Sequence, residues 1–382
     1  MSRPDWEALA ESWELDRYRG RQVFDALHGR GVRDYGAMRE LPAALRQRLA
    51  AELPIRLPEV VRREASADGS VKLGLRLSDG ALIEAVFMPG DRTSAQVNEY
   101  ADARAESRAG DQGPEAGAPS RPLERFTVCL SSQTGCAVDC AFCVTGRLGA
   151  GRNLTAGEIV GQLYAVLTDA DRSPEGMRIV FMGMGEPFLN PDAVIGALDV
   201  LLETISPRRV TVSTSGITPA FARFAALPRR PNLAVSLNAA DTASRERLMP
   251  ITKSYPLDGL LRAVADWPLE PRRTVLVEYV LIAGVNDSAD DARRLARLLR
   301  GLRVKVNLIP LNEDPVYLPG MSRPDEAAID RFARVLADSE LTVTVRRSKG
   351  PDASAACGQL KGRTVDARKR PRDDDRRNIS DR

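Results

Sequence analysis

The sequence predicts an α/β protein built on a partial (β/α)6 barrel, preceded by a small N-terminal helical domain and a short sheet. Two observations predict this fold. Strand-like and helix-like segments alternate regularly after residue 125, as in a parallel sheet with helical crossovers. Before residue 91, helical spacing of the apolar residues gives way to strict alternation.

Residues 1–55 are predicted to form the helical domain, because apolar residues such as Leu9 and Trp13 recur at helical spacing. Its arginines make it resemble an RNA-binding domain. Residues 56–91 are predicted to be a short β extension. Two alternating segments in it flank Ser78-Asp-Gly80, a sequence typical of a hairpin turn.

Two further segments lack the apolar residues that a packed core needs. Residues 92–121 are rich in Ala, Gly, Glu and Arg, so they are predicted to be a flexible insertion. Residues 361–382 are predicted to be a basic tail of mixed charge.

The barrel is predicted to occupy residues 122–360. Its predicted strands are 126–130, 177–182, 209–213, 232–237, 274–282, 305–309 and 341–345. Its predicted helices are 155–167, 192–202, 219–226, 257–265, 289–299 and 325–336. Thr155 and Glu158 form a capping box at the start of the first of these helices. In such barrels, the chemistry gathers at the carboxyl ends of the strands.

The bulk composition is that of an ordinary globular protein, with 43% hydrophobic and 28% charged residues in 382. A net charge of +3 neither implies nor excludes nucleic acid. The chain has no run of about 18 apolar residues, and its N-terminus is too acidic for a secretory signal. We therefore expect a cytoplasmic protein with no membrane association. His28 is the only histidine, which disfavours zinc sites built on several histidines.

The strongest chemical signal is a cluster of three cysteines, Cys136, Cys140 and Cys143, directly after the first barrel strand. Five cysteines in total, an odd number, argue against a disulfide framework in a cytosolic chain. Thiolates at this spacing can bind three corners of a [4Fe–4S] cubane and leave one iron open. The amine and carboxylate of S-adenosylmethionine can bind such an iron. A zinc knuckle without its fourth ligand, or three incidental buried thiols, is much less favoured.

Polar residues at the ends of later strands are the next signal. Gly185 and Glu186 lie in Met182-Gly-Met-Gly-Glu-Pro187, where glycines let the backbone approach a ligand and Glu186 can accept hydrogen bonds from an ammonium group. Taken alone, this segment is more often a simple turn. Polar residues at other strand ends suit hydrogen bonds to the ribose, carboxylate and adenine of the cofactor: Ser213, Ser236, Asn238 and Asn312. Each of them taken singly could instead be a capping or turn residue.

Three more residues have both a structural and a chemical interpretation. Cys129 ends the first barrel strand and Cys357 follows the last, and buried cysteine usually behaves as a small hydrophobe. Gly358, next to Cys357, suits a mobile and exposed thiol. Glu84 has apolar neighbours, and nothing local excludes an ordinary strand carboxylate that faces solvent.

These segments together resemble the radical S-adenosylmethionine RNA adenine methyltransferases, the RlmN/Cfr family, over about residues 17–370. The most specific segments are Cys129-Leu-Ser-Ser-Gln-Thr-Gly-Cys136, the cysteine cluster, MGMGEP, RRVTVSTSG, LIPLN and AACGQL. The resemblance implies a radical-SAM barrel, with a [4Fe–4S] cluster on the three clustered cysteines and S-adenosylmethionine as the second cofactor. It implies cofactor contacts at Gly185, Glu186, Ser213, Ser236, Leu237, Asn238 and Asn312.

The resemblance also implies catalytic roles for Cys357, Cys129 and Glu84. Cys357 is first methylated by one S-adenosylmethionine, and a radical made from a second takes hydrogen from that methyl group. The carbon radical adds to carbon 2 of adenine and so links protein and RNA. Glu84 helps to remove the ring proton, and Cys129 resolves the link by forming a disulfide with Cys357.

The implied partners are 23S ribosomal RNA, with transfer RNA as a second candidate, and an electron donor such as flavodoxin; the protein is expected to be a monomer. Basic residues give modest independent support for RNA binding, although charge runs are more often solvated faces. Those near the two ends of the chain are Arg17, Arg19, Arg21, Arg30, Arg33, Arg346, Arg347, Lys349, Lys361, Arg363, Arg368, Lys369 and Arg370.

Two positions depart from the family pattern. Asn238 stands where relatives usually have histidine, and Leu311 where many have an aromatic residue. Asparagine still donates and accepts hydrogen bonds, so altered cofactor or substrate detail is expected rather than lost activity.

Three alternative functions remain open. Methylation of adenine carbon 8, the antibiotic-resistance type, is not separable from carbon 2 by any residue here. A glycyl-radical activating enzyme would share the cysteine cluster, but Cys129, Cys357 and the helical domain argue against it. The intact cysteines and Glu84 argue against a non-catalytic RNA-binding or ribosome-assembly relative.

Overall fold

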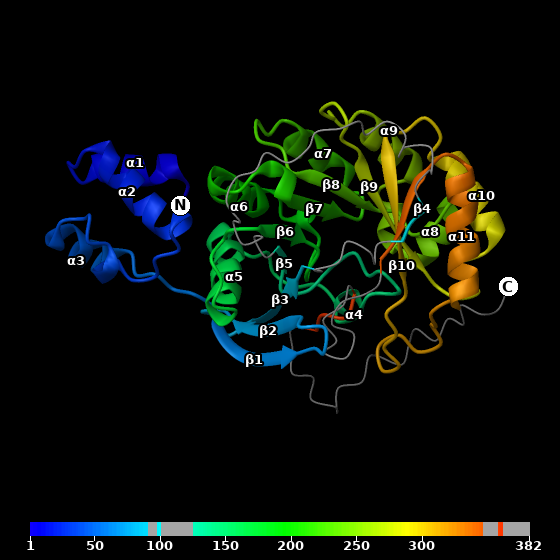
Figure 1. Cartoon of the computed structure of the whole chain (residues 1–382), viewed down its shortest axis with the longest axis horizontal. Coiled ribbons are helices and arrows are strands. Elements are labelled where there is room, and N and C mark those ends of the chain that lie inside the picture. Colours follow the sequence, from blue (N-terminus) through cyan, green and yellow to red (C-terminus); the bar gives the residue numbers. More distant parts are fainter. Residues whose placement is uncertain (91–97, 101–124, 347–357, 362–382) are drawn as a thin grey trace, which may run out of the picture.

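The computed structural model describes residues 1–90, 98–100, 125–346 and 358–361. Its strands form one eleven-stranded sheet in the order β1-β2-β3-β5-β6-β7-β8-β9-β10-β11-β4. In this part of the chain the sheet has two edges, β1 and β4, so the barrel is open. Figure 1 shows helices around the curved sheet and the N-terminal helices to one side, next to α5 and α6.

The N-terminal region is helical, as predicted. Its elements are α1 (Arg3–Ser12), α2 (Arg17–Phe24), the π-helical turn η1 (Asp25–Gly29), η2 (Tyr35–Ala37) and α3 (Ala43–Glu52). Helices α1 and α2 cross closely at Gly20, where a Cβ atom would lie 2.2 Å from the carbonyl oxygen of Trp6. Only glycine fits at this crossing.

Three side chains connect this helical region to the barrel. His28 is hydrogen-bonded through Nδ1 to the hydroxyl of Tyr164, on α5 (Ala156–Asp169). The guanidinium of Arg33 lies 3.5 Å from the centre of the same tyrosine ring. Arg3 pairs with Glu203, on α6 (Pro191–Thr204), at 3.3 Å. The helical region therefore packs against α5 and α6. These helices follow the loop that holds Cys136, Cys140 and Cys143, called the cysteine loop below.

The predicted short sheet consists of β1 (Glu59–Ala65), β2 (Val71–Arg76) and β3 (Leu82–Pro89), all antiparallel. The predicted hairpin turn is confirmed, because the N–H of Gly80 donates to the carbonyl of Leu77 at 2.9 Å. This sheet is not separate from the barrel. Strand β3 pairs antiparallel with β5 (Phe126–Cys129), and Val86 lies opposite Cys129.

The barrel strands run parallel from β5 to β11, in chain order. After β5 they are β6 (Met177–Phe181), β7 (Val210–Thr214), β8 (Asn232–Ser236), β9 (Val275–Leu281), β10 (Val304–Pro310) and β11 (Thr342–Val345). The crossover helices after α5 and α6 are α7 (Thr218–Ala225), α8 (Thr242–Leu248), α9 (Leu257–Ala265), α10 (Ala289–Leu298) and α11 (Glu326–Asp338). The α/β prediction, with six crossovers, is confirmed.

Several elements were not predicted, β1 among them. The cysteine loop ends in a short helix, α4 (Val144–Arg147), and α8 lies between two predicted elements. Within the predicted flexible insertion, β4 (Asn98–Tyr100) pairs antiparallel with β11. The remaining insertion residues lie outside the described ranges, as does the predicted tail beyond Lys361. No helix in the described part of the chain is both long and apolar enough to cross a membrane.

Candidate active site

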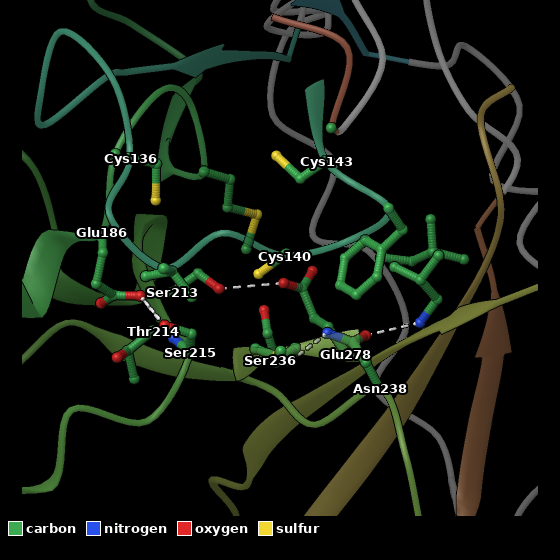
Figure 2. Close-up of a pocket in the computed structure, with 18 of the residues that line it drawn as sticks. Cys136, Cys140, Cys143, Glu186, Ser213, Thr214, Ser215, Ser236, Asn238 and Glu278 are labelled. Carbon is green, nitrogen blue, oxygen red and sulfur yellow. Dashed lines mark hydrogen bonds between the residues drawn. The ribbon is translucent and has the colours of Figure 1, made fainter. Parts of the chain in front are cut away.

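The cysteine loop starts where β5 ends and closes against two other segments. The N–H of Cys136 donates to the carbonyl of Gly149 at 2.9 Å, and the N–H of Ala141 donates to that of Leu248, at the end of α8, also at 2.9 Å. Figure 2 shows the sulfur atoms of Cys136, Cys140 and Cys143 turned toward a common space. The backbone thus presents three thiols from one loop to one side of a cavity.

The chemistry of these thiols fits an iron–sulfur cluster. Among the described residues, no group of three or more His, Cys, Asp or Glu side chains is spaced to hold a single metal ion. A cubane differs, because each thiolate binds its own iron. Burial, together with the neighbouring Cys143, raises the pKa of Cys136 to about 12 and raises the pKa of Cys140 as well. Such thiols become thiolates when a positively charged cluster offsets these penalties.

The cavity next to the cysteines has a volume of about 160 Å³ and is walled by the carboxyl ends of the barrel strands. The structure brings most of the predicted cofactor residues to its wall, together with the three cysteines: Gly185, Glu186, Ser213, Ser236, Asn238 and Asn312. Leu237 is not part of the wall. Its side chain is buried in the core, and its N–H donates to the carbonyl of Glu278 at 2.9 Å.

Glu186 is held rigidly at the end of β6. Its Oε2 accepts hydrogen bonds from the N–H and the hydroxyl of Ser215, at 2.7 and 2.6 Å, and its Oε1 accepts one from the N–H of Phe188 at 2.9 Å. Burial raises the pKa of Glu186, and the hydrogen bonds from Ser215 oppose this shift. Gly185 has a φ of +95°, and a Cβ atom there would lie 2.6 Å from Cβ of Gln133. This position therefore requires glycine.

Asn238, at the position where the family usually has histidine, shapes the cavity wall. Its φ is +59°, a left-handed conformation that asparagine tolerates better than most residues. Its Oδ1 accepts a hydrogen bond from the N–H of Val280 at 2.9 Å, and its Nδ2 donates to Sδ of Met249 at 3.2 Å. The side chain thus ties the end of β8 to β9 and to the segment after α8.

Glu278 is a cavity residue that the sequence-based prediction missed. It lies in the middle of β9, where its Oε2 accepts a 3.1 Å hydrogen bond from the hydroxyl of Ser213 (Figure 2). Burial raises the pKa of Glu278, and Arg346 opposes this shift. The available signal was a single carboxylate within the apolar strand Val275–Leu281.

Arg245, on α8, was also missed, and it is completely buried. Its guanidinium donates to the carbonyls of Ser215, Ser236 and Leu237 at 2.6, 3.1 and 3.1 Å, and to the hydroxyl of Thr252 at 2.7 Å. Burial lowers its pKa to about 10, so it is still a cation at neutral pH. Arg245 therefore fixes the ends of β7 and β8, from which several cavity residues project.

Two of the three predicted catalytic residues, Glu84 and Cys129, lie on the neighbouring strands β3 and β5. Glu84 lies on β3, and its Oε2 accepts a 2.8 Å hydrogen bond from the N–H of Lys361. Cys129 lies on the same face of the sheet, because it pairs with Val86 and residues two apart on a strand share a face. It is buried in the core and does not line the cavity.

Cys357 lies outside the described residues, but the glycine after it is at the cavity wall. The carbonyl of Gly358 accepts a 2.7 Å hydrogen bond from the N–H of Val144, directly after Cys143. Gly358 has a φ of +81°, and a Cβ atom there would lie 3.4 Å from the carbonyl oxygen of Phe142. The chain therefore enters the cavity one residue after Cys357.

Comparisons with known proteins agree with this site. The Radical SAM superfamily model matches residues 130–299. A dual-specificity RNA methyltransferase RlmN from Sorangium cellulosum is 44% identical, over 93% of this chain and 93% of its own length. Another, from Geotalea uraniireducens, is 42% identical over 94% of each chain. The crystal structure of a radical SAM methyltransferase from Sphaerobacter thermophilus has a TM-score of 0.81 and 39% identity, covering 95% of this chain and 98% of that one.

The match to the family model includes the cysteine loop and the ends of β6 to β9 that wall the cavity, whereas the end of β10, with Asn312, lies beyond the matched residues. The cofactors are a [4Fe–4S] cluster and S-adenosylmethionine, in agreement with the thiol chemistry of the loop. Because the chain is more than 40% identical to these RlmN proteins over more than nine-tenths of its length, it belongs to the RlmN family of radical S-adenosylmethionine methyltransferases.

Proposed function

We propose that this protein methylates carbon 2 of an adenosine in large-subunit ribosomal RNA, and also in transfer RNA, through a methylated Cys357. The relatives are dual-specificity RNA methyltransferases, which supports RNA as the substrate. The observation that carries the proposal is the position of residues 358–361. They touch both the cysteine loop, through Val144, and Glu84.

In this proposal, Cys136, Cys140 and Cys143 hold the cluster, and the cavity beside them binds S-adenosylmethionine. When bound, these cofactors supply a radical that can take hydrogen from an unactivated methyl group. The strand ends orient the cofactor. Ser213 and Glu278 offer a hydroxyl and a carboxylate to its hydroxyl groups, and Glu186 offers a carboxylate to its ammonium group.

Glu84 and Cys129 complete the proposed reaction. Glu84 accepts the proton that leaves the methylated ring carbon, and Cys129 forms a disulfide with Cys357 as the link to RNA breaks. Their positions on one face of adjacent strands, with residues 358–361 held to Glu84, support this pairing of roles. Lys361 also pairs with Asp314 through Nζ at 3.0 Å, which adds a second anchor near Cys357.

Two properties of the enzyme follow from this proposal. Because making the radical consumes an electron, the enzyme needs a donor such as flavodoxin. We also propose that the protein is cytoplasmic, since its RNA substrates are cytoplasmic, and that it is a monomer. Methylation assays with and without reduced flavodoxin test the need for a donor, and sedimentation of the purified chain tests the monomer.

The decisive experiment is mass spectrometry of nucleosides from strains with and without the gene. Large-subunit ribosomal RNA from the deletion strain should lack 2-methyladenosine, and the wild-type gene should restore it. Loss of 8-methyladenosine instead would favour the resistance-type activity. Unchanged methylated adenosines would favour a non-catalytic RNA-binding protein.

A further inference from the structure

Glu84 is only 3% exposed, so it has no direct way to return a proton to water. Its Oε2 is covered by the N–H of Lys361 at 2.8 Å. A base that takes one proton in each reaction cycle must lose that proton before the next cycle. The proton on Glu84 must therefore leave through a group in contact with its carboxylate.

Lys72 is such a group, and it is only 1% exposed. Its Nζ lies 2.8 Å from Oε2 of Glu64 and 3.7 Å from Oε1 of Glu84. The strand register explains this position: Glu64 pairs directly with Lys72 across β1 and β2, and Gly74 pairs with Glu84 across β2 and β3. Residues two apart on a strand share a face, so both carboxylates lie on the face of Lys72.

The other groups near Glu84 cannot carry a proton. Arg62 approaches Oε1 of Glu84 to 3.8 Å, but a guanidinium does not release a proton at any physiological pH. The amide of Lys361 donates a hydrogen bond and does not ionise. Among the described residues that contact this carboxylate, Lys72 alone can exchange a proton.

We propose that Lys72 relays the proton from Glu84 to Glu64, whose side chain is 32% exposed and can pass it to water. This inference rests on the proposed role of Glu84 as the base. The ammonium of Lys72 gives a proton to the carboxylate of Glu64 and takes one from the protonated Glu84. Glu64 then releases a proton to water. Both glutamates end as carboxylates and Lys72 ends as an ammonium, so one proton has moved from Glu84 to solvent.

The relay differs in a testable way from an ion network that only holds three strands together. A structural network needs charge and hydrogen bonds: Lys72→Arg preserves both, and Glu64→Gln keeps an oxygen that accepts a hydrogen bond although it removes one negative charge. A relay needs groups that gain and lose protons, and neither replacement does so. In both variants the first reaction should proceed, since Glu84 starts as a carboxylate, and later cycles should slow.

The test uses the full chain with its cluster reconstituted, methyl-labelled S-adenosylmethionine, a ribosomal RNA fragment and excess reductant. Glu64→Gln and Lys72→Arg should each keep the brown colour, the melting temperature and the first-turnover rate. Their steady-state rates should fall by about tenfold or more. Arg76→Gln is the control, because Arg76 pairs with Glu59 on the same strands, where both side chains are exposed, and it should turn over at the wild-type rate.

A wild-type steady-state rate for Glu64→Gln, a conservative change of a partly exposed side chain, would overturn the relay. An equal slowing of the first turnover would also overturn it, because it would show that the network shapes the site. Glu84→Gln separates the two proposals. If this variant resolves the protein–RNA link at the wild-type rate, the role of Glu84 itself is wrong.

Discussion

The N–H of Lys361 donates a 2.8 Å hydrogen bond to Oε2 of Glu84, across 277 positions of the sequence. The carbonyl of Leu360, one residue earlier, accepts a 2.7 Å hydrogen bond from the hydroxyl of Thr145, in the helix that ends the cysteine loop. Leu360 and Lys361 are thus hydrogen-bonded to the cysteine loop and to the N-terminal sheet, respectively. Glu84 is therefore hydrogen-bonded to residues 358–361, which directly follow Cys357 in the sequence.

The three clustered cysteines should be required for colour and activity together. Anaerobically purified wild-type protein should be brown and contain about four irons per chain after reconstitution. Replacing Cys136, Cys140 or Cys143 by Ala should abolish both the absorbance and the methylation. Cys129→Ala should keep the absorbance and serves as the control. A colourless wild type that binds one zinc ion tightly would contradict the cluster assignment.

Cys129→Ala should trap a covalent intermediate. Without its thiol, the link between Cys357 and adenine still forms but cannot be resolved by a disulfide. The variant should run as a nuclease-sensitive, slower band on a denaturing gel. Cys357→Ala should give no such band, because it has no sulfur to methylate. Full activity of Cys129→Ala with no trapped band would make Cys129 only a core residue.

Arg245→Met should destabilise the protein strongly. It removes the donors to the carbonyls of Ser215, Ser236 and Leu237, which stay buried without these bonds. We expect a loss of about 3–5 kcal/mol in the free energy of unfolding, measured by denaturant titration. Arg247→Met is the matched control on the same helix, because Arg247 is exposed and, within the described part of the chain, donates only to Ser244. Equal stability of the two variants would show that these bonds contribute little.

Gly185→Ala should weaken the binding of S-adenosylmethionine in the cavity. The new Cβ would lie 2.6 Å from Cβ of Gln133, so the segment before Glu186 must shift. Equilibrium dialysis with labelled cofactor should show binding weakened by about tenfold or more. Gly284→Ala is the control for the effect of a positive φ without a close contact. Gly284 also has a positive φ, +68°, but no atom lies within 4 Å of its Cβ position. Unchanged binding in Gly185→Ala would show that the cavity adapts.

His28 should make the stability fall as the pH drops below about 6.5. Burial, with the positive N-terminus and Arg33, lowers its pKa from 6.5 to about 3 in the folded protein. Between these two values the unfolded chain binds a proton that the folded chain does not, so stability rises with pH and is lost toward acid. A thermal-melting series from pH 7 to 5 isolates its effect when it is compared with the same series for His28→Gln, because the shifted carboxyl groups Glu186 and Glu278 are present in both chains. His28→Gln should flatten that dependence, and an unchanged slope would refute this origin.

Periodicity predicted the elements of the barrel well, because each crossover helix buries one apolar face. For example, the predicted helix 257–265 is observed as Leu257–Ala265. Patterns could not reveal the charged groups whose burial depends on the complete fold. Lysine, arginine and glutamate are usually found at the surface. The buried examples Lys72, Arg245 and Glu278 are covered only when several segments pack together. Strand β4 was missed for a similar reason, since its three residues are ordered by pairing with β11 rather than by local preference.

The pairing of β3 with β5 has a consequence for synthesis of the chain. The hairpin strands leave the ribosome before β5, so the edge of β3 is ready as a template for β5. From there, each new strand adds beside the one made just before it, up to β11. Most of these strand pairings join segments that are consecutive in the chain. The hydrogen bond between Lys361 and Glu84 is an exception, because it joins residues that are far apart in the sequence. A fragment that begins after residue 121 would lack that template and would expose the edge of β5, so we expect it to aggregate.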